Sequence, residues 1–174
     1  VILGIGGIPN TQLAIKAGLE LGKGKGIWVD EYMRTSDLDI FAVGDCAGKR
    51  DFYTRRDASV MLASTATSEA RIAGANLYQL KVVRENKGTI AIYSTYIDGL
   101  VLASAGLTEK SAKKSGFEII TGNSESADKH PKDMPGAKKI NIKLIFSRQS
   151  GILMGGQVGG GVTAGEIINI IGMA

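Results

Sequence analysis

The residues with the clearest potential to hold a ligand are Gly44 and Asp45, which follow a short apolar run over residues 38–43. This run contains β-branched and aromatic side chains and stands between acidic residues and a glycine, a pattern that predicts a buried strand ending at Gly44. A carboxylate just beyond such a strand lies where open α/β sheets bind ligands, and glycine allows close approach to the backbone. The spacing therefore predicts a ligand-facing Asp45; the simpler alternative is that Asp45 only caps the next turn.

The chain offers little for thiol or metal chemistry, because it contains one cysteine, Cys46, and one histidine, His130. A single cysteine excludes an internal disulfide and a two-cysteine redox motif. Cys46 is most simply a small side chain beside the run over residues 38–43. One histidine and one cysteine do not make a metal-ligand cluster, and His130 is expected in a surface loop. We predict no metal ligands and no catalytic residue within these positions.

Composition fits one medium-sized domain or two small domains with hydrophobic cores. The 174 residues are 44% hydrophobic and 22% charged, which is not the composition of a disordered chain. No window reaches the ~18 consecutive apolar residues of a membrane span, and the first residues lack the pattern of a signal peptide. We therefore predict a soluble, cytoplasmic protein without a membrane partner.

The formal net charge of +4 arises from short basic runs. These runs have almost no interleaved aromatic residues and match no nucleic-acid-binding module, so we predict solvated surface and no nucleic-acid partner. An alternative is that they help to bind cofactor phosphates. The runs comprise Lys23 and Lys25; Lys49, Arg50, Arg55 and Arg56; and Lys110, Lys113 and Lys114.

The first half of the chain predicts alternating strands and helices. Residues 1–5 are strand-like, and a helical pattern follows from Leu13 to Leu21 with Thr11 as its N-cap. Gly4 and Gly6 resemble a dinucleotide fingerprint, but Pro9 occupies the third glycine position and offers no amide, which argues against a pyrophosphate cradle.

Two further elements flank the Gly44–Asp45 position. A hairpin begins at Ile27, in which Trp28 is expected to pack in the core. A helix is predicted from Leu62 to Tyr78, with Ser64 or Thr65 as its N-cap. The charged, glycine-terminated segment 81–88 then suits a domain boundary.

The second half has the pattern of an antiparallel layer. Strands over residues 89–97 and 100–105 flank Asp98-Gly99, a strong hairpin signal, and Thr108 caps a short helix that ends at Gly116. Further strands are predicted over 117–121, 139–146 and 152–158, with a long polar loop over 123–138. In the strand over 139–146, one face carries Ile140, Ile142, Leu144 and Phe146.

The last segment runs from a strand into an apolar helix. Residues 159–164 satisfy G-x-G-x-x-A, yet the preceding strands alternate like an antiparallel layer, which a Rossmann turn does not permit. Thr163 and Glu166 are expected to form a capping box. The helix that follows is apolar almost all round, so we expect it to be buried, either within this chain or between subunits. Residues 1–3 begin within an apolar run and residues 167–174 stop within a helical pattern, which predicts a fragment of a longer protein.

The ordered motifs resemble those of the pyridine nucleotide-disulfide oxidoreductases, in particular the branch of NADH oxidases and coenzyme A-disulfide reductases. The matching segments cover nearly the whole chain in the family's order. They are VILGIGGIPNTQL (1–13), GIWVDEYMRTSDLDIFAVGDCAG (26–48), ASAGLTEKSAKKSG (103–116), PGAKKINIKLIF (135–146) and GILMGGQVGG (151–160).

This resemblance implies a cofactor and its contacts. Asp45 would accept hydrogen bonds from the ribityl chain of FAD, with Gly44 beside it, and the N-terminus of the helix at residues 62–65 would point at the pyrimidine edge of the flavin. The implied cofactors are FAD and NAD(P)H, and the implied partners are a second copy of the chain and a small-molecule or small-protein electron acceptor. The implied cofactor-binding residues are Gly44, Asp45, Leu62, Ala63, Ser64 and Thr65.

The predicted fold class is α/β followed by α+β: the C-terminal part of a Rossmann-like FAD-binding domain, then a mostly antiparallel interface domain. Residues 1–86 would hold the end of the NAD domain and the C-terminal part of the FAD domain, and residues 87–174 a truncated dimerisation domain. The predicted function is electron transfer from NAD(P)H through FAD to a disulfide, oxygen or a carrier. The alternative is a non-catalytic assembly module that binds no cofactor.

Overall fold

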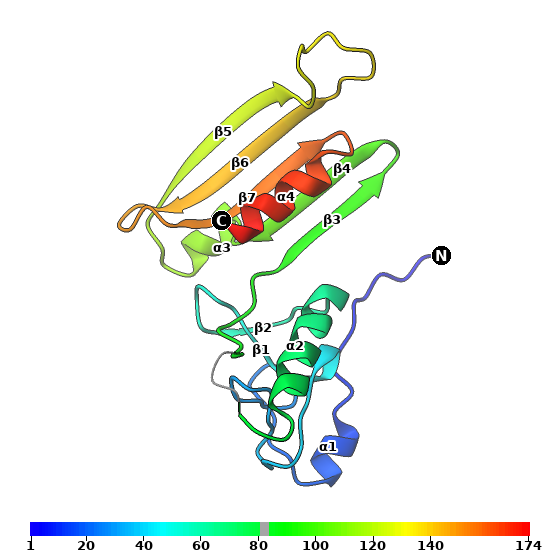
Figure 1. Ribbon diagram of the computed structural model, residues 1–174, viewed down its shortest axis with the longest axis vertical. Coiled ribbons are helices and arrows are strands. Elements are labelled where there is room, and N and C mark those ends of the chain that lie inside the picture. The colour runs from blue at the N-terminus through cyan, green and yellow to red at the C-terminus, as the bar shows by residue number, and fades with distance from the viewer. Residues whose placement is uncertain (81–83) are drawn as a thin grey trace. The chain divides into compact units, whose positions relative to one another are not determined.

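The computed structural model describes residues 1–80 and 84–174 and divides into two compact units, Val1–Thr89 and Ile90–Ala174 (Figure 1). The charged segment 81–88 that we expect at a domain boundary includes residues 81–83, which lie outside the described residues. Among the described residues, no helix has both the length and the apolarity needed to cross a bilayer.

The first unit contains short elements around one long helix. A buried cluster of Met33, Ala42, Ala47 and Ala73 forms its core. Its longest helix, α2, is rich in alanine, which favours helix formation and allows close packing. The elements are α1 (Gln12–Lys16), the 3-10 helix η1 (Gly44–Cys46), the paired strands β1 (Lys49–Arg50) and β2 (Asp57–Ala58), and α2 (Ala63–Asn76).

Two strand predictions in the first unit are wrong. Residues 1–5 are irregular and exposed, and residues 38–43 form no strand but only one antiparallel bridge, between Arg34 and Phe41. A strand requires a hydrogen-bonded neighbour along its length. Among the described residues, residues 40–42 pair only with residues 33–35, and no bridge pairs residues 1–5. Ala42 is buried, whereas Val43 is 38% exposed.

Helix ends in this unit also differ from the predictions. α1 ends at Lys16, and the Thr11 side chain makes no capping bond. The N-cap of α2 is Leu62, whose extended backbone turns the chain into the helix, so Ser64 and Thr65 lie in the first turn rather than at the cap. Trp28 is 38% exposed and lies outside the buried core cluster, contrary to the prediction.

The second unit confirms the predicted antiparallel layer. Its five strands pair in the order β3-β4-β7-β6-β5, and every neighbouring pair is antiparallel. Helix α4 packs against this sheet beside β4 and β7 (Figure 1). The elements are β3 (Ile92–Ile97), β4 (Leu100–Gly106), α3 (Glu109–Lys114), β5 (Ile119–Ala127), β6 (Lys139–Ser147), β7 (Leu153–Gly160) and α4 (Ala164–Met173).

Local signals in this unit are confirmed. Asp98 and Gly99 both have positive φ, 47° and 81°, and join β3 to β4 with Ile97 paired to Leu100. This is the conformation that Asp-Gly favours in two-residue hairpins. Thr108 caps α3 through a capping box with Ser111. Both features depend on neighbours close in sequence, so their patterns were sufficient.

The strand predictions for β5 and β6 need correction. β5 continues to Ala127, where we expected a polar loop from residue 123, because its backbone pairs with β6 even though its side chains are mostly exposed. The alternation in β6 is broken by a register shift between Ile145 and Phe146. Ile145, predicted on the opposite face from the apolar row, is also fully buried, so side chains on both faces of β6 are covered.

The last helix, α4, is only partly covered. Ala164 and Ile168 are buried against the sheet, whereas Ile170 is 67% exposed, so this chain alone does not bury the whole helix, and its burial between subunits stays a prediction. The predicted capping box is wrong: Thr163 has helical backbone angles, and its hydroxyl donates a hydrogen bond to Asp128 at 2.9 Å. β7, which leads into α4, is antiparallel to both of its neighbours, unlike the first strand of a Rossmann unit.

Candidate functional site

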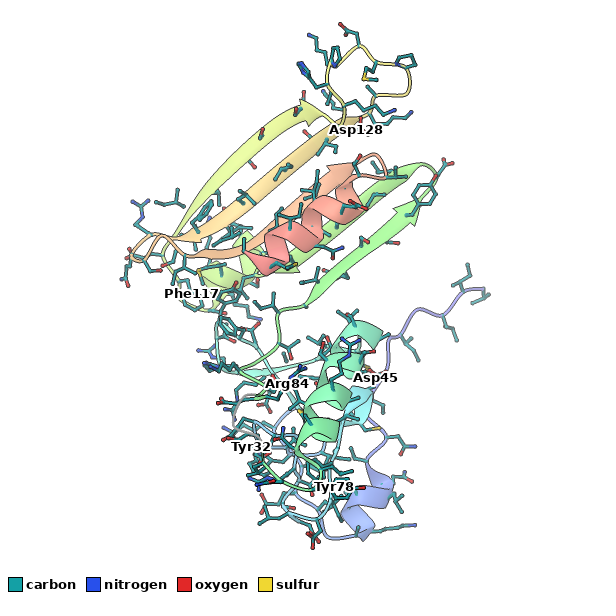
Figure 2. All side chains as sticks on the ribbon, in the orientation of Figure 1. Tyr32, Asp45, Tyr78, Arg84, Phe117 and Asp128 are labelled. Atoms are coloured by element: carbon teal, nitrogen blue, oxygen red, sulfur yellow. The ribbon has the colours of Figure 1, made fainter. Side chains whose placement is uncertain are left out.

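The predicted site centres on the turn over residues 44–47. Val43 is extended, and Gly44 has a φ of +76°, a left-handed conformation that glycine adopts without strain. Asp45 is the second residue of the 3-10 helix η1 and is exposed, and Figure 2 labels it in the first unit. The turn thus presents a carboxylate at the surface, as expected for a ligand-facing acid.

The first turn of α2 lies beside this turn. A Cβ added to Gly44 would lie 3.7 Å from the Cβ of Ala66. The first backbone bond of the helix runs from the Ala66 amide to the Leu62 carbonyl, so within the described residues the amides of Ala63, Ser64 and Thr65 donate to no acceptor. Free amides and the positive end of the helix dipole favour anionic or carbonyl groups of a ligand.

The structure therefore brings all six predicted site residues into one region of the first unit. Gly44 and Asp45 form the turn, and Leu62, Ala63, Ser64 and Thr65 form the adjacent start of α2. A hollow next to Asp45 is also lined by Pro9, Gly26, Lys49 and Met61. Cys46 is partly buried, and its thiol donates a hydrogen bond to the Asn10 carbonyl at 3.6 Å.

A buried ion pair under the turn was not predicted. Lys49, which we expected on a solvated surface, is only 7% exposed, and Glu69 on α2 is 1% exposed. The Lys49 ammonium lies 3.2 Å from Oε2 of Glu69. The sequence did contain a signal: Glu69 stands between Ala66 and Ala73 at helical spacing, on the face that packs.

Burial and local partners act in opposite directions on Glu69. Loss of water raises the pKa of its carboxyl above the ordinary value, and the nearby negative charge of Asp45 adds to this rise. The Gly44 amide, which donates to Oε2 at 2.8 Å, and the Lys49 ammonium lower the pKa. The net shift is upward because burial has the largest effect.

The available groups fit one part of FAD. An exposed carboxylate accepts hydrogen bonds from hydroxyl groups such as those of the ribityl chain, and three free amides donate to the carbonyls of the ring. Neither arrangement forms a glycine-rich cradle for a pyrophosphate, which Pro9 also opposes at the first turn. Among the described residues, no group of three or more His, Cys, Asp or Glu side chains is placed to hold a metal ion.

Comparison with known proteins identifies the family. Residues 1–70 match the family model for pyridine nucleotide-disulphide oxidoreductases, and residues 92–174 match the model for the dimerisation domain of the same family. The chain therefore belongs to the pyridine nucleotide-disulphide oxidoreductases, which confirms the resemblance found in the sequence.

Individual relatives agree with this assignment. The chain is 33% identical over 174 residues to an NADH oxidase of Methanocaldococcus jannaschii, matching 100% of this chain and 38% of that protein. An NAD-dependent persulfide reductase from A. fulgidus has a TM-score of 0.88 and 32% identity, over 95% of this chain and 30% of that one. Reduced Bacillus anthracis CoADR-RHD has a TM-score of 0.92 and 31% identity, over 99% of this chain and 31% of that one. The chain thus spans between 30% and 38% of the length of these proteins.

Proposed function

We propose that this chain is part of a FAD-dependent oxidoreductase that transfers electrons from NAD(P)H through FAD to a disulfide, oxygen or a carrier acceptor. The observation that carries this proposal is the exposed Asp45 on a glycine turn that packs against the open start of α2. The relatives named as an NADH oxidase and an NAD-dependent persulfide reductase support the same reaction class.

The residues of this chain would bind and orient the flavin. FAD itself supplies the hydride and electron chemistry when bound. Asp45 would accept hydrogen bonds from the ribityl hydroxyls, with Gly44 allowing their close approach. The amides at the start of α2, around Leu62 and Ala63–Thr65, would favour negative charge at the neighbouring edge of the ring by about 0.3–2 kcal/mol.

The second unit would serve as a dimerisation module, so we propose a homodimer. The match of residues 92–174 to a dimerisation domain supports this. The proposed domain limits remain residues 1–86 for the flavin-related part and 87–174 for the dimerisation part. We further propose a cytoplasmic location and a small-molecule or small-protein electron acceptor.

The test uses the full-length gene product. Purified protein should carry stoichiometric FAD after gel filtration, and anaerobic addition of NADH or NADPH should bleach its absorbance. Subsequent addition of oxygen, a disulfide or a persulfide should restore the colour with the correct acceptor. A colourless product that binds no added FAD would contradict the proposed function and favour the alternative, an assembly module without a cofactor.

A further inference from the structure

The buried pair of Lys49 and Glu69 calls for an explanation beyond stability. The two residues are 7% and 1% exposed, and their charged groups lie 3.2 Å apart. Taking both charges out of water commonly costs as much as their attraction returns, and apolar residues of similar size would pack at no such cost. Moreover, Oε1 of Glu69 is buried without a hydrogen-bond partner in the described structure.

Both charged groups of this pair bind the backbone of the turn at residues 44–47. Oε2 of Glu69 accepts the Gly44 amide at 2.8 Å. The Lys49 ammonium donates to the Gly44 carbonyl at 2.5 Å and to the Ala47 carbonyl at 3.0 Å. Asp45 therefore lies in sequence between Gly44 and Ala47, whose carbonyls both accept hydrogen bonds from the Lys49 ammonium.

This arrangement fixes a backbone that would otherwise be easily rotated. Gly44 has no side chain to restrict it, and peptides next to a left-handed glycine have several accessible orientations. The amide and the carbonyl of Gly44 are both hydrogen-bonded to buried side chains, those of Glu69 and Lys49. These two bonds fix the orientation of the Gly44 backbone. The direction in which the Asp45 carboxylate leaves the turn follows from that orientation.

We propose that Lys49 and Glu69 are positioning residues that hold the 44–47 turn and thereby aim the Asp45 carboxylate at the hydroxyl groups of its ligand. This inference rests on the proposed function, in which that ligand is the ribityl chain of FAD. It assigns the buried charges to ligand binding, through the backbone, rather than to the stability of the first unit.

The test is a double-mutant cycle in the full-length flavoprotein. FAD affinity is measured by adding FAD to apo-protein in wild type, Lys49→Met, Asp45→Ala and the combined variant. Lys49→Met should weaken FAD binding about 10-fold or more, the scale of a lost charged hydrogen bond. In the Asp45→Ala background the same change should have almost no effect, because no carboxylate remains to be aimed. A purely structural role predicts the same loss in both backgrounds.

A second variant guards against unfolding, because Lys49→Met leaves the Glu69 carboxylate unpaired. Lys49→Met with Glu69→Gln removes both charges while retaining an acceptor for the Gly44 amide. This variant should keep the melting temperature of wild type yet bind FAD about 10-fold more weakly, since the two carbonyls have lost their ammonium donor. Lys110→Met, at an exposed lysine of the second unit, should leave FAD affinity unchanged.

Two results would overturn the inference. One is wild-type FAD affinity in the folded Lys49→Met/Glu69→Gln variant. The other is an equal effect of Lys49→Met with and without Asp45. If wild type binds FAD and either result is obtained, the positioning role fails while the proposed function stands. If wild type binds no FAD, the proposed function fails and this inference fails with it.

Discussion

Asp45 is the residue on which the proposed flavin contact depends most directly. Its side chain is exposed on η1, so it can accept hydrogen bonds from a ligand without leaving a buried position. Asp45→Ala in the full-length protein should cost about 1.5–3 kcal/mol of FAD binding, or roughly 10- to 150-fold in affinity. Titration of apo-protein with FAD measures this loss.

Asp39→Ala is the matched control, because Asp39 is an exposed acid outside the turn. It should leave FAD affinity unchanged. Equal affinities for wild type and Asp45→Ala would contradict the assignment of Asp45. Asp30 is a poor control, since it accepts bonds from the amides of Tyr32 and Arg34 and pairs with the Arg34 guanidinium, so its removal would disturb the local fold.

A second residue, Glu109, predicts a pH dependence of stability. Its carboxylate binds the ammonium groups of Lys113 and Lys143, which lower its pKa from 4.5 to about 2. Because the folded pKa is the lower one, its contribution to stability is present above pH 4.5 and is lost as the pH falls towards 2. The stability of Glu109→Gln should therefore decline less than that of wild type over this range.

Urea unfolding followed by circular dichroism from about pH 6 to about pH 2 measures this difference. Glu69 acts in the opposite sense, since burial raises its pKa and its ionisation disfavours the folded state as the pH rises. Comparing wild type with Glu109→Gln cancels that contribution. If the unfolding free energies of the two proteins fall in parallel with pH, the Glu109 contacts do not contribute measurably to stability.

At the residue scale, the sequence predicted the turn residues Gly44 and Asp45 better than the buried ion pair that contacts them. Gly44 and Asp45 lie in a motif with a distinctive series of residue types, and the structure places them beside the predicted start of α2. Glu69 and Lys49 are 20 residues apart by number, and no local pattern indicates that they pair. Their contact arises only from the packing of α2 against the turn, which single-sequence periodicity does not encode.

At the scale of elements, α4 shows that an apolar helix has distinct faces. Ile171 packs against the sheet: a Cβ added to Gly156 would lie 2.9 Å from its Cγ2. Ile170, the preceding residue, is 67% exposed. Ile171→Lys should therefore lower the free energy of unfolding by about 3 kcal/mol or more, because it places an unpaired charge against a packed core.

Urea denaturation of the second unit measures this loss, with Ile170→Lys as the matched control. The control adds the same charge one residue away on the same helix. At a protein concentration low enough for the unit to be monomeric, it should leave the unfolding free energy within about 0.5 kcal/mol of wild type. Equal destabilisation by both changes would mean that α4 packs differently from the structure described.

One hairpin and the cap of α3 were predicted from local chemistry, whereas other helix caps and the extents of two strands were not. The Asp98-Gly99 hairpin and the Thr108 cap need only residues within a few positions of each other. Residues 38–43 have the composition of a strand, yet their pairing with the chain near Arg34 is limited to one bridge at Phe41, so no strand forms. Conversely, β5 extends to Ala127 through polar residues because β6 supplies a complete partner.

At the scale of the whole molecule, the second unit exposes apolar side chains that a monomer would leave in water. On and near α4 these are Val162, Ile170 and Met173, with exposures of 72%, 67% and 87%. A closed two-fold pairing is the commonest way to bury such a surface. Together with the match to a dimerisation domain, this supports the exposed face of α4 as part of the contact between two copies.

Ile170→Lys tests this contact without disturbing the fold. In a dry interface the added ammonium would cost about 3–5 kcal/mol and raise the dimer dissociation constant at least ~100-fold. Sedimentation of the full-length protein should then show a dimer for wild type and a concentration-dependent shift to monomer for the variant. Gln149→Lys adds the same charge at an exposed turn between β6 and β7 and should remain dimeric. An unperturbed Ile170→Lys dimer would place the contact on another surface of the second unit, whereas a wild-type monomer would contradict the proposed homodimer itself.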